Sequence, residues 1–435
     1  MMRKGEHKKK IVAKTYEFEQ YVNLSIQWTR WILKSIGLWP NSRSTMNKYI
    51  YRLINILCYS LIIYLVVPCS LYVFLEVKDV YDKIKLLGPL NFCVMAFLKY
   101  YLLNIHEEDI RECVERIEWD WKNLTYSKDR EVMIENANFG RKLVIVCVFF
   151  MYSGFAFYYI ALPISVGKIP AQDQNLTFIP MLFPFSKFII DTRNSPINEL
   201  CFSFQVLAGA LLHSITAAAC SLAAVLAVHS CAQMQVLINW LNHLIDGRSD
   251  MEDDVDRRLA MIVNQHVQLL QFLALIKKTL ESVSFVEFLG SMLNICLLGY
   301  YIIMESNSNH LTSTMTFLVI LISLIFNIFI YCYIGELVAE QVNLKRSWPM
   351  EATIVFLFLF SPNGFCQCKQ IGEVSYMVNW YKLRGSKKLP VILIIAMANS
   401  SVKLTAGNIV DLCLTTFSDV VKTAVAFLNV LRTVT

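Results

Sequence analysis

Long runs without charged residues dominate the hydrophobic pattern of this chain. A helix that crosses a membrane needs roughly 17 to 25 predominantly apolar residues. Five runs are near or above that length: Leu53 to Leu75, Leu143 to Gly167, Leu200 to His229, Phe288 to Met304 and Ser306 to Gly335. The pattern therefore predicts an all-α integral membrane protein, since helices satisfy their own backbone groups in lipid.

Two further segments bring the expected number of transmembrane helices to seven. Leu86 to Ile105 is long enough but contains Lys99, whose aliphatic stem could let the amine reach one face of the membrane. Leu389 to Leu431 is apolar with polar interruptions. We expect this last helix to be split into a cytosolic half and a membrane half, with Gly407 permitting the break.

Lys and Arg residues are concentrated in alternate loops. The denser loops hold 29 of them and the sparser loops hold 6. The denser group comprises residues 1–48, 104–142, 229–280 and 336–390, and the sparser group comprises 76–88, 166–199 and 304–312. Because short cytoplasmic loops carry the positive excess, we expect a cytosolic N-terminus and, after seven crossings, an extracellular C-terminus. This inverted topology argues against a metabotropic seven-helix receptor.

The composition agrees with a chain surrounded by membrane lipid. Hydrophobic residues make up 56% of its 435 residues and charged residues only 17%. The net charge of +6 does not indicate nucleic-acid binding, because the excess lies in loops beside the apolar runs. The sequence contains no nucleotide-binding, zinc-protease or nucleophile-elbow motif. We therefore expect no enzyme activity, no cofactor and no metal site.

Two charged segments between the spans carry apolar residues at helical spacing. One runs from Glu107 to Glu135 and the other from Asp253 to Lys278. Both are interpreted as helices that project beyond the bilayer on the cytosolic side. They could pack against their neighbours, or they could assemble subunits below the membrane.

Several short motifs lie in about the last 65 residues of the chain. They are Ile371-Gly-Glu-Val-Ser-Tyr376, Asn379-Trp380-Tyr381, Lys403-Leu-Thr405-Ala-Gly407, Thr416-Phe417, Lys422-Thr423 and Val430-Leu431-Arg432-Thr433. Together these motifs resemble the C-terminal signature of insect odorant receptors.

The resemblance implies a ligand-gated, non-selective cation channel in the plasma membrane of olfactory neuron dendrites. In such a heterotetramer an odorant-binding subunit pairs with an odorant co-receptor subunit, and small volatile molecules are the ligands. A gustatory receptor of the same superfamily is the alternative that the sequence leaves open.

The segment after Gly407 carries polar or small residues at spacings of three and four. These residues are Asp411, Thr415, Ser418, Lys422, Ala426, Asn429 and Thr433. A polar stripe on a membrane helix favours contact with water, as in a pore. Alternatively, Asp419 and Lys422 pair locally and the stripe packs against other helices. The resemblance places a hydrophobic gate at Val430 and Val434, where a pore could close by dewetting.

The resemblance places the ligand site in the outer half of the bundle, between the second, third, fourth and sixth spans. The third span offers Tyr152, Phe155 and Tyr159, and the fourth offers Phe204 and His213. Aromatic rings suit apolar volatile ligands, and a hydroxyl or an imidazole could orient them. The same residues could equally be ordinary helix packing.

The chain divides into four expected regions. Residues 1–48 form a cytosolic N-terminal segment, and residues 49–335 contain the first six transmembrane helices with cytosolic extensions. Residues 336–388 form a cytosolic loop, and residues 389–435 contain the split seventh helix, with the assembly region and the pore.

Residues Val342 to Gln370 depart from the family resemblance, because relatives run almost directly from Gln341 to Ile371. The segment includes Ala352 to Phe360, which is apolar apart from one threonine and too short to span a bilayer. One hypothesis is a retained intron read in frame, since a valine codon begins like a splice donor and a glutamine codon can end like an acceptor. The alternative is a genuine membrane-dipping or regulatory insertion.

Overall fold

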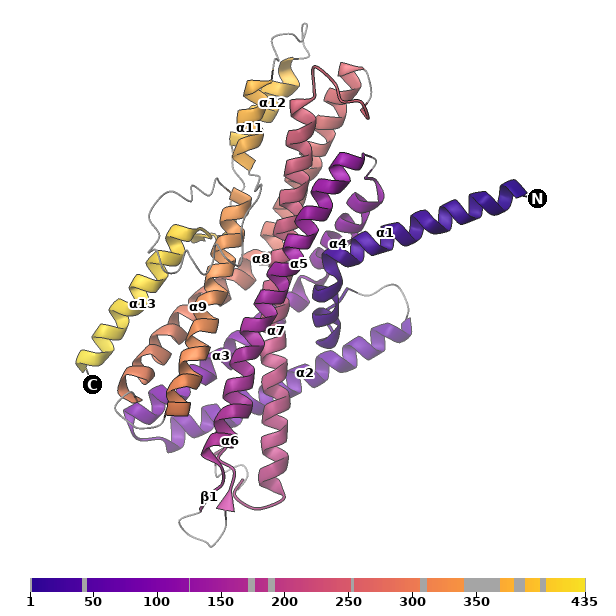
Figure 1. Cartoon of the computed structure of the whole chain (residues 1–435). Coiled ribbons are helices and arrows are strands. Elements are labelled where there is room, and N and C mark those ends of the chain that lie inside the picture. The colour runs from indigo at the N-terminus through magenta and orange to yellow at the C-terminus, as the bar shows by residue number, and fades with distance from the viewer. Residues whose placement is uncertain are drawn as a thin grey trace.

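A computed structural model of the chain shows an all-α bundle of long helices (Figure 1). The structure describes residues 2–40, 45–124, 126–170, 177–186, 192–251, 254–305, 311–339, 368–378, 388–399 and 404–434. Residues 342–367 of the atypical segment lie outside the described residues, and Cys368 begins a helix.

Within the described ranges, six helical segments are long and apolar enough to cross a membrane. They belong to α2 (Thr45–Leu71) with η1 (Tyr72–Glu76), α3 (Val80–Ile105), α5 (Ser127–Phe155) with η2 (Ala156–Ala161) and α6 (Leu162–Val166), α7 (Ile197–Asn242), α8 (Val255–Glu305) and α9 (Leu311–Ala339). The apolar runs thus predicted the first six helices correctly.

The remaining elements are shorter or lie at the ends of the bundle. They are α1 (Met2–Ser35), α4 (Glu107–Lys122), β1 (Ile169–Pro170), β2 (Thr177–Phe178), α11 (Cys368–Met377), α12 (Lys388–Asn399), β3 (Thr405–Ala406), β4 (Val410–Asp411) and α13 (Leu414–Val434). The strands form two antiparallel pairs, β1 with β2 and β3 with β4.

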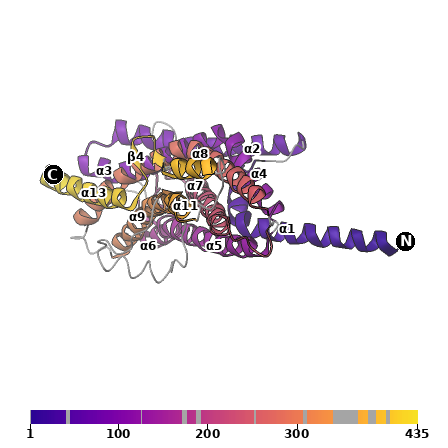
Figure 2. The ribbon, with the colours of Figure 1, turned by 90° about the horizontal axis from the view of Figure 1, so that it is seen from above.

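Helix α7 forms the centre of the bundle (Figure 2). Of the residues in its most apolar stretch, 83% are buried, against 28% for α2. Small residues run along α7, including Ala217, Ala223 and Ala227, and all three are buried. Small side chains let helices approach closely, which is how helices associate in lipid, where apolar burial gives little driving force.

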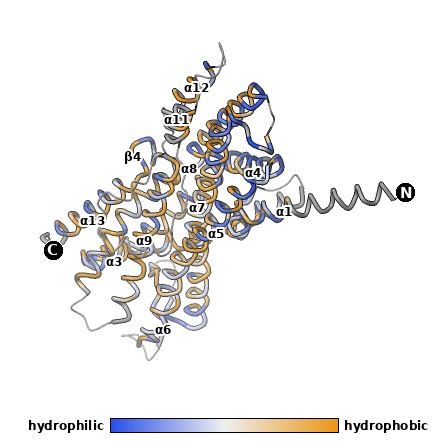
Figure 3. Tube along the Cα trace, turned by 45° about the horizontal axis from the view of Figure 1, so that its top comes forward, coloured by the Kyte–Doolittle hydropathy of each residue, from blue (hydrophilic) through white to orange (hydrophobic). Residues whose placement is uncertain are grey.

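Helices α7 and α8 continue without a break over 46 and 51 residues. One helix, α8, joins most of the charged segment Asp253–Lys278 to the span at Phe288–Met304, as expected of a helix that extends beyond the span. The segment Glu107–Glu135, expected as one helix, is instead divided between α4 and α5. Hydrophilic residues gather around α4 and the neighbouring helix ends (Figure 3).

Helix α4 is held to the bundle by an apolar face and by ion pairs. Ile110, Cys113 and Ile117 are fully buried. Lys278 Nζ of α8 lies 2.7 Å from Asp109 Oδ1. Burial raises the pKa of Asp109, but hydrogen bonds from His106 and Lys278 outweigh that effect and leave the pKa below its ordinary value.

A short hairpin, rather than a simple helix break, precedes α13. Gly407 has φ +60° in its turn, a conformation that glycine adopts readily. Asp411 lies in strand β4, which corrects the expectation that it belongs to the last helix. The helix begins at Leu414, whose backbone N–H donates to Glu336 Oε2 of α9 at 3.2 Å.

Candidate ligand-binding site

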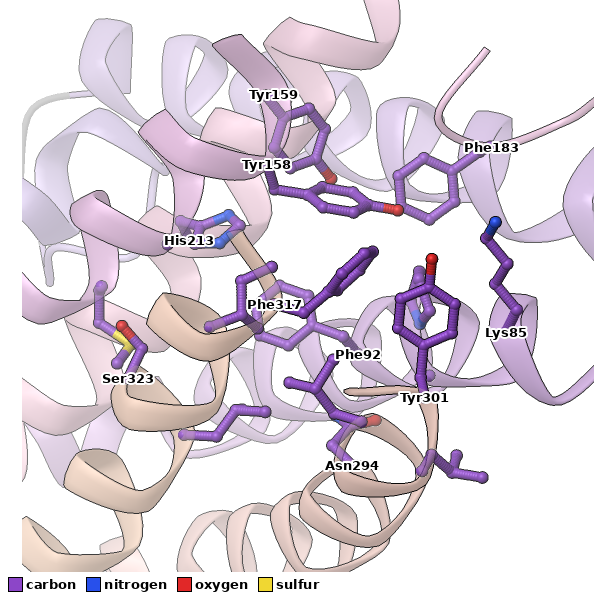
Figure 4. Close-up of a pocket in the computed structure, with 18 of the residues that line it drawn as sticks. Lys85, Phe92, Tyr158, Tyr159, Phe183, His213, Asn294, Tyr301, Phe317 and Ser323 are labelled. Carbon is purple, nitrogen blue, oxygen red and sulfur yellow. The ribbon is translucent and has the colours of Figure 1, made fainter. Parts of the chain in front are cut away.

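An apolar cavity lies between α3, the α5–η2 segment, α7, α8 and α9 (Figure 4). Its volume is about 100 Å³. The lining residues are Ile84, Lys85, Gly88, Pro89, Phe92, Met151, Gly154, Tyr158, Tyr159, Phe183, His213, Asn294, Leu297, Leu298, Tyr301, Phe317, Ile320, Ser323 and Leu324. Pockets with apolar walls and a few polar groups are typical small-molecule sites.

The π-helical turn η2 carries two of the aromatic walls, Tyr158 and Tyr159. Such turns occur often at functional sites, because the extra residue redirects the side chains that follow it. The Tyr159 ring packs against α7 at Gly209, where an added Cβ would lie 2.2 Å from Tyr159 Cε1. Glycine at this position therefore allows the tyrosine ring to lie between the two helices.

The aromatic rings at this end of the cavity support one another. The Tyr159 ring centroid lies 5.2 Å from that of Phe155 and 5.8 Å from that of His213. The His213 ring also lies 5.0 Å from Phe92 of α3. These contacts fix the imidazole between three helices, since edge-to-face and offset ring pairs stabilise a definite geometry.

Two of the five residues predicted for the ligand site, Tyr159 and His213, line this cavity. Phe155 lies behind them, packed on both rings. The Tyr152 hydroxyl is instead 2.7 Å from Ser214 Oγ of α7. Phe204 is half exposed and packs against Tyr64 of α2, away from the lining.

The fifth span, α8, contributes a wall that the sequence interpretation missed. Asn294, Leu297, Leu298 and Tyr301 all line the cavity. Their spacing of three, four and seven residues is that of one helix face. This stripe of residues was the signal in the sequence that could have indicated the wall. A stripe that lines a cavity looks the same in sequence as one that packs on another helix, so the facing helix must be known.

Two polar side chains of the lining, Ser323 and Asn294, already have hydrogen-bond partners within the protein. The Ser323 hydroxyl donates to the Phe150 carbonyl oxygen. Asn294 accepts from Asn91 Nδ2 at 3.0 Å and donates to Met95 S at 3.5 Å. Lys85 lies at the other end of the cavity from His213, with its amine 5.3 Å from the Tyr301 ring centroid (Figure 4).

A buried polar layer lies on the same helices, beyond the His213 end of the cavity. Lys99 Nζ of α3 lies 2.7 Å from Glu287 Oε2 of α8 and 2.8 Å from Thr216 Oγ1 of α7. Lys99 was expected to extend towards a membrane face, and this was wrong because its side chain is fully buried. Asn327 of α9 and Ser291 donate to the other Glu287 oxygen.

Helix α13 packs on α8 and α9 through one apolar face. Val420 and Ala424 are buried there, and the Phe417 ring lies 5.4 Å from Phe329 of α9. The predicted polar stripe lies on the other side. Its exposed members among the described side chains are Thr415, Ser418, Lys422, Ala426 and Asn429.

The structure also describes two other predicted features of α13, the local Asp419–Lys422 pair and the gate residue Val430. Lys422 Nζ lies 3.7 Å from Asp419 Oδ1, so the local pair forms, but both side chains are about three-quarters exposed. Val430 is 56% exposed within the single chain. The side chain of Val434 lies outside the described residues.

The described part of the chain contains no cluster of three or more His, Cys, Asp or Glu side chains suited to a metal ion. The eleven cysteines whose state is described are free. The side chains that line the cavity offer apolar contact, ring stacking and a small number of hydrogen bonds.

Comparison with solved structures shows the same fold in an insect olfactory receptor. The OR5 receptor of Machilis hrabei, in a complex with eugenol, superposes with a TM-score of 0.69 at 12% identity, covering 98% of this chain and 99% of that one. A second structure of the same receptor superposes with a TM-score of 0.68 at 13% identity, covering 95% of this chain and 100% of that one. At these identities the likeness shows the fold.

Sequence comparison gives two distant relatives. Odorant receptor 10 of Aedes albopictus is 21% identical over 261 residues, which is 58% of this chain and 60% of the relative. Odorant receptor 82a of Drosophila melanogaster is 22% identical over 257 residues, or 59% and 57%. The chain thus matches about three-fifths of the length of these curated relatives.

The model of the 7tm odorant receptor family matches residues 80–344, which is more than half of the chain. That region contains α3 to α9 and therefore most of the cavity lining described above. The chain belongs to the insect odorant receptor family of multi-pass membrane proteins.

Proposed function

We propose that this chain is the odorant-binding subunit of a heteromeric, ligand-gated, non-selective cation channel. The observation that carries the proposal is the aromatic cavity, two of whose walls, α8 and α9, also hold helix α13. A ligand that changes the packing of these walls would thereby act on α13. The odorant co-receptor of the family would supply the other subunits of the heterotetramer.

The ligand is a small volatile molecule that binds in this cavity. The lining is mainly aromatic and aliphatic, which suits an apolar body with few polar atoms. The related receptor of Machilis hrabei was solved with eugenol, a molecule of this kind. That relative supports the ligand class, whereas the particular odorant depends on this chain's own lining.

Helix α13 forms the seventh crossing and lines the pore. Its apolar face contacts α8 and α9, so the exposed polar stripe faces away from its own subunit. A charged side chain such as Lys422 is costly in hydrocarbon and requires water or a partner there. Four such helices around one axis would give a water-filled path, with Val430 and Val434 as its hydrophobic gate.

The N-terminus lies in the cytosol and the C-terminus outside, in the plasma membrane of olfactory neuron dendrites. The excess of Lys and Arg supports this orientation, because the denser loops fall on the side of α4. The hydrophilic helix ends around α4 would then form the cytosolic assembly region together with α11 and α12.

The proposal is tested by whole-cell recording from cells that express this chain with and without an odorant co-receptor. A panel of single-ring and short-chain volatiles is applied while surface expression is measured on the same cells. We expect cation currents that require both the co-receptor and a ligand. Normal surface expression with no current to any ligand would contradict the proposed function.

A further inference from the structure

We propose that His213 makes the cavity selective for small ligands that donate a hydrogen bond, such as single-ring alcohols and phenols. The inference rests on the proposed function in one respect, namely that this cavity holds the odorant. It goes further by naming the ligand group that is recognised and the atom that recognises it, Nε2 of His213.

The hydrogen bond on the far side of the imidazole sets the tautomer. His213 Nδ1 lies 2.9 Å from the carbonyl oxygen of Gly209, one turn earlier in α7. A carbonyl oxygen can only accept, so Nδ1 carries the proton. In a neutral imidazole the other nitrogen is then an acceptor and cannot donate. His213 Nε2 therefore presents a lone pair.

The ring is held so that it cannot easily turn this atom away. Phe92, Phe155 and Tyr159 surround it, with centroid distances of 5.0, 5.7 and 5.8 Å. His213 is part of the cavity lining, and Nε2 makes no hydrogen bond within the described part of the chain. An acceptor without a partner in an apolar cavity favours a ligand that brings a donor.

The other polar side chains of the lining do not impose the same requirement. Ser323 and Asn294 already have partners inside the protein. The hydroxyls of Tyr158, Tyr159 and Tyr301 can donate as well as accept, so they tolerate either kind of ligand group. Lys85 only donates, and it lies at the opposite end of the cavity (Figure 4).

The cavity size sets the body of the ligand. Its volume of about 100 Å³ is of the same order as apolar protein cavities that hold a single benzene ring. The aromatic walls add ring contacts for such a body. The structure thus indicates one ring or a short chain, with an O–H or N–H group directed at His213.

Benzyl alcohol and benzaldehyde make a matched pair of test ligands. They have the same ring and nearly the same volume, but the aldehyde oxygen can only accept. Placed at His213, the aldehyde would set lone pair against lone pair and leave Nε2 without a partner. The missing hydrogen bond should lower the affinity for the aldehyde about tenfold. Benzyl methyl ether is a second acceptor-only ligand, and toluene has no polar atom.

The experiment is equilibrium dialysis of ring-labelled ligands against the full chain in lipid nanodiscs, with empty nanodiscs to subtract partition into lipid. We expect benzyl alcohol to bind about tenfold tighter than benzaldehyde, and benzyl methyl ether to behave like the aldehyde. In His213→Phe the alcohol should lose that advantage while benzaldehyde binding is kept. Leu207→Val, at an exposed position of α7 outside the lining, should keep the preference.

Equal binding of alcohol and aldehyde, binding of neither, or a preference that survives His213→Phe would each overturn the inference. If His213→Phe does not fold, binding of the four ligands to the unmodified chain still tests the inference. A requirement for a donor predicts that both acceptor-only ligands bind weakly. Dialysis measures binding and does not depend on channel opening. If the chain prefers the alcohol but gives no currents, only the proposed channel function is contradicted. If it gives currents but shows no preference, only the inference about His213 is contradicted.

Discussion

Lys99 and Glu287 form an ion pair, with Nζ and Oε2 2.7 Å apart and side-chain exposures of 0% and 2%. The pair joins α3 to α8 within the membrane-spanning part of the bundle. Thr216 of α7 accepts a hydrogen bond from Lys99, and Ser291 of α8 and Asn327 of α9 donate to Glu287. Four of the helices that enclose the cavity are thereby tied together at one level.

Removing one charge of this pair should destabilise the protein strongly. Lys99→Met leaves the Glu287 carboxylate buried without its cation, which costs about 3–5 kcal/mol. The double variant Lys99→Met with Glu287→Gln removes both charges and should recover most of that loss. Melting temperatures measured by fluorescence in detergent give the comparison. Equal melting temperatures for the single variant and the unmodified chain would contradict the buried pair.

Gly209→Ala should close the cavity at its aromatic end. The added methyl would lie 2.2 Å from Tyr159 Cε1, so the ring must move towards the ligand space. Overpacking of this kind costs about 1–3 kcal/mol, and we expect at least about a tenfold loss in benzyl alcohol affinity. The control is Gly88→Ala, another lining glycine, whose methyl would meet only Leu297 Cβ at 4.0 Å. Equal affinity in both variants would refute the assignment of the cavity.

Gly335→Ala should uncouple the hairpin from α9. The added methyl would lie 2.1 Å from the Leu412 carbonyl oxygen, a backbone atom that cannot rotate away. We expect ligand-evoked current to fall at least about tenfold at normal surface expression, with benzyl alcohol binding retained. In Gly299→Ala the close atom is Leu428 Cδ1, the end of a flexible side chain, so current should change little.

Lys422→Gln should raise the cation conductance of single channels, because a positive charge in a cation pore repels the permeant ion. Thr423→Ser on the same helix is the control, since Thr423 bonds to the Asp419 carbonyl within α13. We expect an increase of about twofold for the first variant and none for the second. Unchanged conductance in Lys422→Gln would favour packing of the stripe between subunits over pore lining.

The segment Val342 to Gln370 is tested by comparing transcripts with the gene. We expect some transcripts to lack it, as a retained intron requires, and the chain without it to give larger currents. The family model ends at residue 344, close to the start of the segment. If all transcripts carry the segment inside one coding exon, the intron hypothesis is wrong and a genuine insertion remains.

The apolar runs predicted the first six membrane helices because length and absence of charge are local properties. The extension of α8 beyond its apolar span was predictable because apolar residues recur at helical spacing in Asp253–Lys278, although the two parts of the helix carry different patterns. The C-terminal resemblance indicated the receptor family, and the family match confirms it. It also confirms the expectation that the chain is not an enzyme.

The candidate site was less predictable because it depends on which helix faces meet. Tyr159 and His213 could be selected as aromatic residues of the third and fourth spans, but Phe204 has the same local appearance and is half exposed. Lys99 seemed to need a route to water, since its partner Glu287 is 188 residues away in sequence. Such contacts between distant segments are fixed only by the packed fold.

The contact between Gly335 and Leu412 has a consequence for how such receptors diversify. The helix and the hairpin approach each other closely there, so the joint depends on the missing methyl group of Gly335 and on the hydrogen bond from Leu414 to Glu336. Cavity residues on the same helix, such as Phe317 and Ile320, can change without altering that joint. Odour preference and channel opening can therefore be altered by separate mutations, which lets one scaffold acquire new ligands while its output stays the same.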